Sequence, residues 1–493
     1  MQKLGVLVSG ALVALGCAKA APPPVSPATA AQATSVTKSD EALVATGDPG
    51  AQSAGEPADS PAPPRKDAPW IGAAAEGELL STSTRETFLG VWVDVPEARP
   101  EMRPPMEVVL VVDTSGSMSG TKIESARAAA ATLVRSLRDG DIVALDAFAD
   151  ETRTLVPPTR LDVQSRREIL GEIARLSPSG STNMFSGLST AESQMAGAPA
   201  SHALRRIVMI SDGRANVGPS SPEALGSLAE NGARRFRAQV TSLGVGIDYD
   251  ERTLNALSFR TSGRMYHIGE PREMAGILRS EIGLLDATVA SDASLEIVPA
   301  PGVQVLDADG LRAEHREGGL RVPLGALYAG QHREALVRVR IVDPGVFEGH
   351  TRPLASVRLR FRDASEGDLE RIQEVVARAQ LSDDQAAIAR SVSSRTKAIV
   401  AIMEASKTQL SAAQRINDGN FVDADKELER AQQTLAAQAR VVTAPAERKR
   451  LEAAATKVGA TRAAAQAMPS KPKAAQRAGA LEINADAMHS AGF

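Results

Sequence analysis

The chain has 493 residues, of which 43% are hydrophobic and 24% are charged, and its formal net charge is −4 at pH 7. A chain of this length can stabilise itself by burying a large core. The near-neutral charge, the lack of a basic stripe and an aromatic share of 3% argue against a nucleic-acid-binding surface, which needs basic patches and stacking platforms. We therefore expect no nucleic-acid partner.

The first 16 residues are typical of a targeting segment. Lys3 supplies a positive charge, and Leu4 to Leu15 form an apolar run. This run is too short to span a bilayer, which needs about 20 residues. It leads into Gly16 and Cys17, the only cysteine of the chain. We therefore predict a signal peptide over residues 1–16.

The sequence around Cys17 resembles a bacterial lipobox, in which small residues precede a cysteine that is lipidated and becomes the mature N-terminus. The alternative is an ordinary signal peptide followed by an incidental cysteine. Ala18 stands where the resemblance to enteric sorting rules would place an aspartate for inner-membrane retention. The resemblance therefore implies a lipid-anchored protein of the cell envelope, in the outer membrane of a Gram-negative bacterium.

Residues 17–75 are rich in Ala, Pro, Ser and Thr and lack an apolar period, which predicts a disordered tether. No later run of 18 or more apolar residues occurs, so we expect the lipid to be the whole membrane link. Within residues 76–105, Glu86 to Val95 alternate in the manner of a strand. We assign this strand to the β-sandwich predicted below, because it has no obvious partner in the domain that follows it.

Val108 to Val112 form a run of apolar, mostly β-branched residues, as expected of a buried parallel strand. The run ends at Asp113, and Ser115 and Ser117 follow at every second residue. In an open α/β sheet, ligands bind at the carboxyl ends of the strands. Oxygen-only ligands of this kind suit a hard divalent cation such as Mg²⁺.

Two later segments supply further oxygens. Thr182 lies in a Gly/Ser loop just before a predicted helix, and Asp212 follows the apolar strand Arg206–Ile210. Taken alone, Asp113 could be a helix N-cap and the Ser-Asp-Gly at 211–213 a simple turn. Taken together, the three segments favour one metal site.

These three motifs, in this order, resemble those of the von Willebrand factor A domain over roughly residues 106–286. The resemblance implies a metal-ion-dependent adhesion site whose ligands are Asp113, Ser115, Ser117, Thr182 and Asp212. It also implies Mg²⁺, with Mn²⁺ or Ca²⁺ as alternatives, and a protein partner whose acidic side chain completes the coordination shell. Such a site breaks no bond, so we expect no enzyme activity.

Strands alternate with helices through residues 106–286, which predicts an α/β fold with a doubly wound, Rossmann-like parallel sheet. After the first strand, at 108–112, the pattern indicates further strands at 142–148, 206–210, 239–246 and 264–268 and helices at 122–137, 251–261 and 273–285.

Residues 287–363 change period. Val337, Val339 and Ile341 alternate with arginines, and residues 357–361 repeat the pattern. Strict alternation is typical of half-buried antiparallel strands, so we predict a β-sandwich flanking the α/β domain. We interpret the alternating arginines as solvated positions on the outer faces.

Residues 364–465 are predicted to form a helical hairpin region. Ile388, Val392, Ile399, Met403 and Leu410 follow one another at spacings of four and seven residues, and Asp418-Gly419 marks a turn before a second helix. A further helix is expected from Pro445 to about Ala465. Residues 466–493 are expected to be a disordered tail.

Together these features predict a membrane-anchored, metal-dependent protein-binding module of unknown oligomeric state. One alternative is a scaffold or assembly factor of an envelope complex, which the C-terminal helices favour. Another is a metal-assisted hydrolase, which would need a general base beside the metal. The motif loops hold no histidine or spare glutamate, and we expect the buried Asp146 to have a hydrogen-bonding partner rather than a role at the site.

Overall fold

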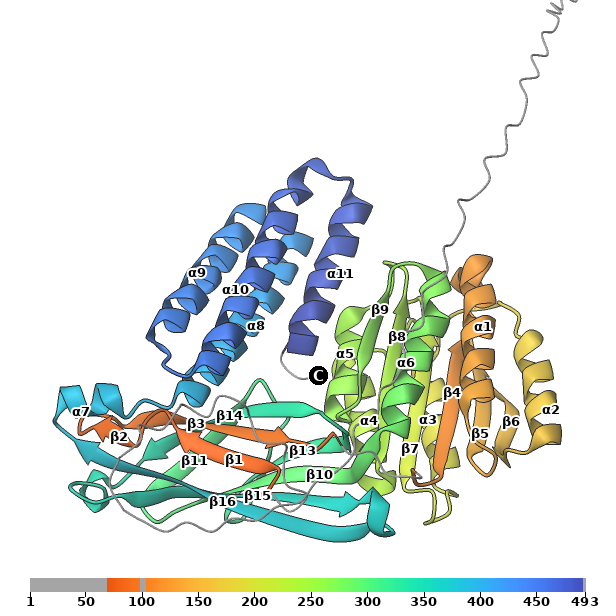
Figure 1. Ribbon diagram of the computed structural model, residues 1–493. Coiled ribbons are helices and arrows are strands. Elements are labelled where there is room, and N and C mark those ends of the chain that lie inside the picture. Colours follow the sequence, from red (N-terminus) through yellow and green to blue (C-terminus); the bar gives the residue numbers. More distant parts are fainter. Residues whose placement is uncertain (1–68, 98–102, 491–493) are drawn as a thin grey trace, which may run out of the picture. The chain divides into compact units, whose positions relative to one another are not determined.

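The structure is a computed structural model, and it describes residues 69–97 and 103–490 (Figure 1). The predicted signal peptide, Cys17 and the tether as far as residue 68 lie outside the described residues. All of the described residues belong to one compact unit. Among them, no helix combines the length and the apolar character that crossing a membrane requires.

The first part of the fold is an α/β domain built on a six-stranded sheet of order β6-β5-β4-β7-β8-β9 (Figure 1). Neighbouring strands are parallel, except that β6 runs antiparallel to β5. The strands are β4 (Met106–Asp113), β5 (Ile142–Phe148), β6 (Thr152–Arg160), β7 (Leu204–Ser211), β8 (Ala238–Val245) and β9 (Met265–Ile268).

Helices cover both faces of this sheet. One hydrophobic cluster joins the sheet to α1 (Thr121–Ser136), α2 (Val163–Ala174) and α6 (Met274–Asp286). A second cluster, on the other face, joins it to α3 (Met184–Met195), α4 (Pro222–Phe236) and α5 (Glu251–Arg260). The α/β, doubly wound fold class predicted from the sequence is confirmed.

Three elements of this domain escaped the sequence analysis: β6, α2 and α4. The edge strand β6 contains Pro157 and Pro158, and proline is tolerated only where a ladder hydrogen bond is not needed. Helix α4 carries Gly226 and Gly232, which weaken the helical signal. The predicted parallel sheet thus carries one antiparallel edge strand, β6.

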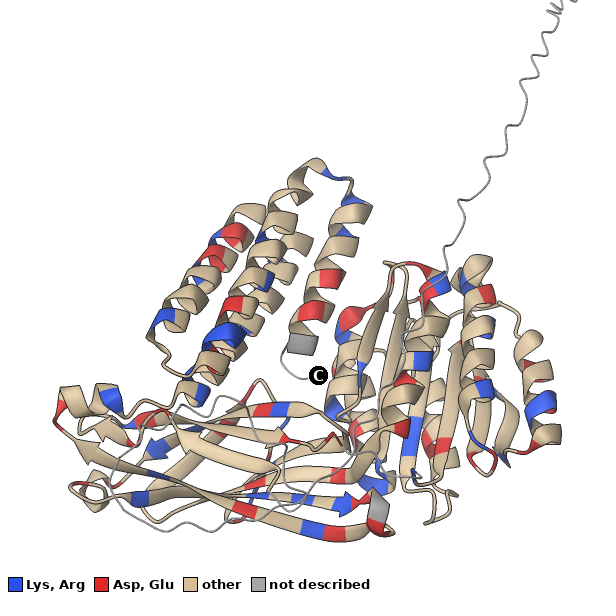
Figure 2. Cartoon of the chain, viewed as in Figure 1, with Lys and Arg blue, Asp and Glu red and all other residues tan. Residues whose placement is uncertain are grey.

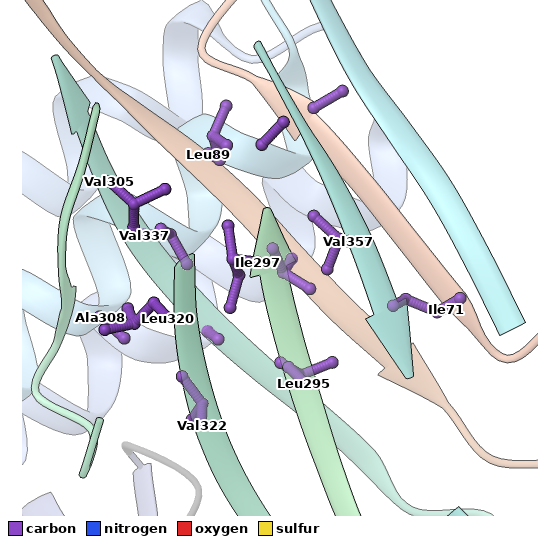
Figure 3. Close-up of a cluster of buried hydrophobic side chains, with 14 of the residues drawn as sticks. Ile71, Leu89, Leu295, Ile297, Val305, Ala308, Leu320, Val322, Val337 and Val357 are labelled. Atoms are coloured by element: carbon purple, nitrogen blue, oxygen red, sulfur yellow. The ribbon is translucent and has the colours of Figure 1, made fainter. Parts of the chain in front are cut away.

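The second part is a β-sandwich of two sheets, with strand orders β1-β3-β14-β11 and β12-β13-β10-β15-β16-β2. Figure 3 shows the side chains that fill the space between them, among them Leu89, Leu295 and Val337. The strands are β1 (Ile71–Ala75), β2 (Leu79–Ser81), β3 (Glu86–Asp94), β10 (Thr288–Pro299), β11 (Val303–Asp309), β12 (Glu314–Arg316), β13 (Gly319–Tyr328), β14 (His332–Ile341), β15 (Arg352–Asp363) and β16 (Leu369–Ser382).

Strand β3 pairs with β14 along its whole length, which confirms that strand 86–95 belongs to the sandwich. Both faces of β3 carry apolar side chains, because the sandwich core covers one face and a helix covers the other. Leu89 and Val91 point into the sandwich core, whereas Trp92 packs against a cluster that includes Ile399 of helix α8 (Ser394–Asn417). A side chain at Gly90 would meet that helix, because an added Cβ would lie 2.9 Å from the Thr396 hydroxyl.

The alternating arginines lie on the outer faces of the sandwich, as predicted, and form ion pairs there. Arg338 pairs with Asp307 at 2.6 Å, and Arg358 pairs with Glu374 at 3.2 Å. Figure 2 shows positions of both charge signs along β15 and β16. These arginines therefore balance neighbouring carboxylates.

The third part is a helical segment of α7 (Gln385–Arg390), α8 (Ser394–Asn417), α9 (Phe421–Val441), α10 (Pro445–Gln466) and α11 (Lys473–Ser490). Its core is rich in alanine, with Leu428, Leu435 and Leu451 as its larger members. Gly419 adopts a φ of +79°, which forms the predicted turn between α8 and α9.

Three predicted boundaries differ from the structure. Residues 71–75, placed in the tether, form β1, and the sandwich ends at Ser382 rather than at residue 363. The helical region therefore begins at Gln385, not at 364. Residues 473–490, predicted to be a disordered tail, form α11. In each case the segment contains few large apolar residues, and its order comes from packing against distant partners.

Candidate metal-dependent site

The candidate site lies at the carboxyl ends of β4 and β7, which are neighbours in the sheet. Asp113 is the last residue of β4, and Asp212 directly follows β7. Val112 and Ile210 are register partners, so the two strands end at the same level. Both aspartates are fully buried. The parallel pairing thus places two carboxylates side by side at one edge of the sheet.

The serines of the first motif connect these carboxylates. The backbone N–H of Ser115 donates to Asp113 Oδ1 at 2.8 Å, and the Ser117 hydroxyl donates to Asp212 Oδ1 at 2.7 Å. The two hydroxyl oxygens lie 3.0 Å apart. A 3₁₀ turn over Gly116–Met118, anchored by the buried Met118, holds the exposed Ser117 in place.

Thr182 joins the same group from the loop before α3. Its backbone N–H donates to Asn216 Oδ1 at 2.9 Å, and its carbonyl accepts from the Asn216 N–H at 3.0 Å. The loops are also linked by the Gly116 N–H, which donates to the Gly180 carbonyl at 3.0 Å. Thr182 itself is buried.

The convergence of these oxygens is clearest around Gly213. A Cβ added there would lie 3.3 Å from Thr182 Oγ1, 3.7 Å from Ser117 Oγ and 3.9 Å from Asp113 Oδ2. Oxygens from two loops, the one after β4 and the one before α3, therefore face Gly213 of a third loop, and the missing side chain of Gly213 keeps the space between them open. The structure brings together all five residues that the sequence singled out: Asp113, Ser115, Ser117, Thr182 and Asp212.

Two residues near this group escaped the sequence analysis. The Ser211 hydroxyl donates to Asp113 Oδ2 at 2.5 Å, and the Lys122 ammonium forms an ion pair with Asp212 Oδ2. Lys122 lies in the first turn of α1, directly after the serine motif. The position of Lys122 in the sequence is a usable signal, because a helix that starts beside a site can place the side chains of its first turn close to that site.

Burial raises the pKa of Asp113 to about 6, although hydrogen bonds from Ser211 and Ser115 act in the opposite direction. The neighbouring charge of Asp212 also raises this pKa. An electrostatic cost of this kind is what a bound cation would relieve. The carboxylate is thus held where ionisation is unfavourable without a nearby positive charge.

Other acidic residues near the sheet edge have supporting roles. Asp150 accepts from the Ser181 N–H at 3.1 Å, and Gly180 next to it adopts a φ of +77°, a conformation that favours glycine. Asp146 accepts from Thr154 at 2.7 Å and from Gln194 at 2.8 Å, so the expected partners are present. Over residues 69–97 and 103–490, no cluster of three or more His, Cys, Asp or Glu residues suits a metal.

Comparisons with known proteins agree with this geometry. Residues 108–214 match the model of the von Willebrand factor type A domain. The Escherichia coli (strain K12) protein YfbK is 28% identical over 256 residues, which cover 50% of this chain and 44% of YfbK. The inter-alpha-trypsin inhibitor heavy chain H1 of Mesocricetus auratus is 26% identical over 198 residues, 38% of this chain and 21% of that one. The chain thus spans less than half of the length of these two relatives.

A solved structure described as von Willebrand factor type A from Catenulispora acidiphila has a similar fold. It superposes with a TM-score of 0.65 at 21% sequence identity and covers 76% of this chain and 87% of its own. At that identity the likeness supports the fold alone. The family match, the sheet order and the three converging loops lead to one conclusion: the chain carries a von Willebrand factor type A domain.

Proposed function

We propose that the chain is a metal-dependent protein-binding module that engages an acidic side chain of a partner at the edge of β4 and β7. Domains of this type often mediate protein–protein interaction. The observation that carries the proposal is the convergence of hydroxyl and carboxylate oxygens from two loops on Gly213, which lies in a third.

The chemistry of the donors fits a hard divalent cation. They are all oxygens, and the two carboxylates lie in a buried setting with Lys122 as the neighbouring positive charge. Asp113 and Asp212 would hold the ion, and Ser115, Ser117 and Thr182 would orient it. Mg²⁺ is the expected ion, and Mn²⁺ or Ca²⁺ are alternatives. When bound, the ion would supply the positive charge that attracts a carboxylate oxygen of the partner.

The side chains of this domain supply the access and the rigidity that such binding needs. Ser117 is exposed, and Gly213 offers no side chain to block the approach. The hydrogen bonds between loops fix the oxygens before a partner arrives, which lowers the entropic cost of binding. The proposal assigns no bond-breaking step to the chain.

The proposal includes a lipid at Cys17 that anchors the chain to the cell envelope, most simply the outer membrane of a Gram-negative bacterium. Its support is the sequence of residues 1–18 alone. Mass spectrometry of the N-terminal peptide tests this part, because an unmodified Cys17 on the mature chain would refute it.

The metal site is tested by calorimetric titration of the chain with Mg²⁺ and Mn²⁺. We expect one site in the native chain and a loss of most binding in Asp113→Ala and Asp212→Ala, since one carboxylate cannot balance a divalent ion. Asp139→Ala is the matched control, because this exposed aspartate pairs with Arg166 away from the site. Unchanged affinity in either site variant would show that the assignment is wrong.

A role as a scaffold or assembly factor of an envelope complex is the second candidate, and one observation favours it. Helix α11 packs on the helical segment through Ile483 and contributes Leu481 to a core cluster of the α/β domain. Capture of partners with and without a chelator separates the two roles. Partners lost with the chelator belong to the metal site, and partners retained belong to another surface.

A further inference from the structure

A concave site lies at the opposite edge of the sheet from the candidate metal site. The pocket has a volume of about 460 Å³ and is lined by the first residues of β4, β7 and β8, by the end of α4 and by strands of the sandwich. Contacts between domains bound it, since the Ser262 hydroxyl donates to the Pro323 carbonyl at 3.1 Å. The pocket therefore has walls from two domains.

Its lining is strongly cationic. Eight arginines and only two carboxylates, Asp292 and Glu314, line the pocket. Glu314 is shared by several of these arginines, among them Arg316 at 2.8 Å and Arg321 at 3.5 Å. Glu230 and Asp368, which lie outside the lining, pair with Arg312 at 3.2 Å and with Arg237 at 3.7 Å, so the positive charge of the lining is balanced in part.

Two of the arginines, Arg205 and Arg206, make no hydrogen bond to a carboxylate among the described residues. Arg206 is only 2% exposed, and its Nε and Nη1 have no hydrogen-bond partner among the described residues. Its Nη2 donates to the Tyr328 hydroxyl at 3.1 Å, and the carboxylate of Glu281 lies 3.8 Å from Nε. Arg205 donates only to backbone carbonyls, such as that of Phe236 at 3.0 Å. Buried donors without acceptors are costly, and an incoming anion would satisfy them.

Burial lowers the pKa of Arg205, and the nearby charge of Arg237 lowers it further. Arg237 itself closes α4 in the left-handed region, with a φ of +57°. A non-glycine residue there is uncommon. That backbone conformation ends α4 and directs the chain into β8. It places Arg237 in the lining of the pocket.

We propose that this pocket binds a small, multiply charged oxyanion of the polyphosphate or phosphate-ester class. The planar guanidinium group binds tetrahedral oxyanions through paired hydrogen bonds, which suits a lining whose cations are all arginines. The volume is in the range of pockets that hold small ligands. The ligand would be contacted by both domains, and the proposal is independent of the metal site.

The test is calorimetric titration of the full chain with sodium tripolyphosphate, in a chelator-containing buffer at about 0.15 M salt. The pocket variants are Arg237→Asn, since asparagine tolerates a positive φ, and Arg321→Gln. We expect the dissociation constant to rise about tenfold in each. Arg340→Gln is the matched control, because Arg340 is exposed on β14 and pairs with Glu86 outside the pocket.

Thermal melts followed by circular dichroism show whether each variant is folded. If Arg321→Gln unfolds, Arg316→Gln replaces it, since Arg316 is largely exposed. Absence of binding by the native chain, or equal affinity in the pocket and control variants, would overturn the proposal. Asp113→Ala should bind tripolyphosphate as the native chain does, which separates a failure here from a failure of the metal site.

Discussion

The ammonium group of Lys122 pairs with Oδ2 of the Asp212 carboxylate, one of the two carboxylates of the candidate metal site. Oδ1 accepts from Ser117, so Asp212 has one oxygen on the serine motif and one on the lysine. A divalent ion and Lys122 would therefore share one buried carboxylate. Lys122 offsets part of the negative charge of the Asp212 carboxylate. It would therefore compete with the divalent ion for that carboxylate.

We expect Lys122→Met to tighten Mg²⁺ binding by about tenfold, because one competing positive charge is removed. The same change should lower the metal-free stability by about 1–3 kcal/mol, because a buried carboxylate loses its partner. Calorimetry and thermal unfolding with a chelator measure the two effects. Lys407→Met is the control, since Lys407 pairs with Asp309 on the surface. Weaker metal binding in Lys122→Met would show that the lysine assists the ion instead.

Glu107 is a second buried charge in the same sheet, at the beginning of β4. It is 0% exposed, and neither carboxylate oxygen has a hydrogen-bond partner among the described residues. Burial raises its pKa to about 7, although the charge of Arg205 acts in the opposite direction. Because the folded state holds this proton more tightly than the unfolded state does, its contribution to stability is lost as the pH rises from about 4.5 to about 7.

Glu107→Gln should therefore stabilise the fold at about pH 8, by about 2–3 kcal/mol, and leave it nearly unchanged at about pH 4. Denaturant unfolding at the two pH values measures this difference. Glu124→Gln serves as the control, because Glu124 is exposed on α1 and its replacement should have the same small effect at both pH values. A Glu107→Gln effect that does not depend on pH would contradict the argument.

At the scale of elements, β3 connects parts of the fold that are far apart in the sequence. It lies between β1 and β14 in its sheet, and its outer face meets α8. Arg395 of α8 lies 4.4 Å from the centre of the Trp92 ring and pairs with Asp94 at 2.9 Å. Strand β3 thus pairs within its sheet, contributes side chains to the sandwich core and contacts helix α8.

A chain that begins at Met106 should keep a folded α/β domain but lose the protection of the sandwich. The truncation removes β1, β2 and β3 and so exposes the edge of β14 and the apolar core behind it. Limited proteolysis should cut residues 287–382 faster than in a chain that begins at residue 63, while 106–286 resists in both. Equal protection of 287–382 in the two chains would show that β3 is dispensable.

Helix α11 shows how an element can depend on partners more than on its own sequence. Its buried residues divide between two clusters, with Ala480 and Ile483 in the helical segment and Leu481 in the α/β domain. Arg477 pairs with Glu251, at 3.1 Å between Nη1 and Oε1. Small, sparse apolar residues carry little periodic signal, which is why the helix was not predicted.

At the scale of the whole molecule, the cationic pocket and the candidate metal site lie at opposite edges of one sheet. β7 begins at the cationic pocket, with Arg205 and Arg206, and ends beside the candidate metal site, with Ser211. The carboxylate-lined edge suits a cation, and the arginine-lined edge suits an anion. Because the strands are parallel, their arginine-bearing beginnings lie at one edge of the sheet and their carboxylate-bearing ends lie at the other.

The sequence alone was enough to predict the α/β domain, the strand that joins the sandwich and the five residues of the candidate metal site. These features have local signals. A buried parallel strand is a continuous apolar run, and parallel strands place their ends at one edge, so Asp113 and Asp212 had to meet once the strands were recognised.

Only the tertiary structure decided the course of β1, β16 and α11, the pairing of Lys122 with Asp212, and the pocket that joins Arg206 to Arg321. The physical reason is the same in each case. These segments and side chains have weak or polar local patterns, and their burial depends on residues far away in the chain. A weakly apolar segment becomes ordered only when a distant partner removes its surface from water, and that partner cannot be read from the segment itself.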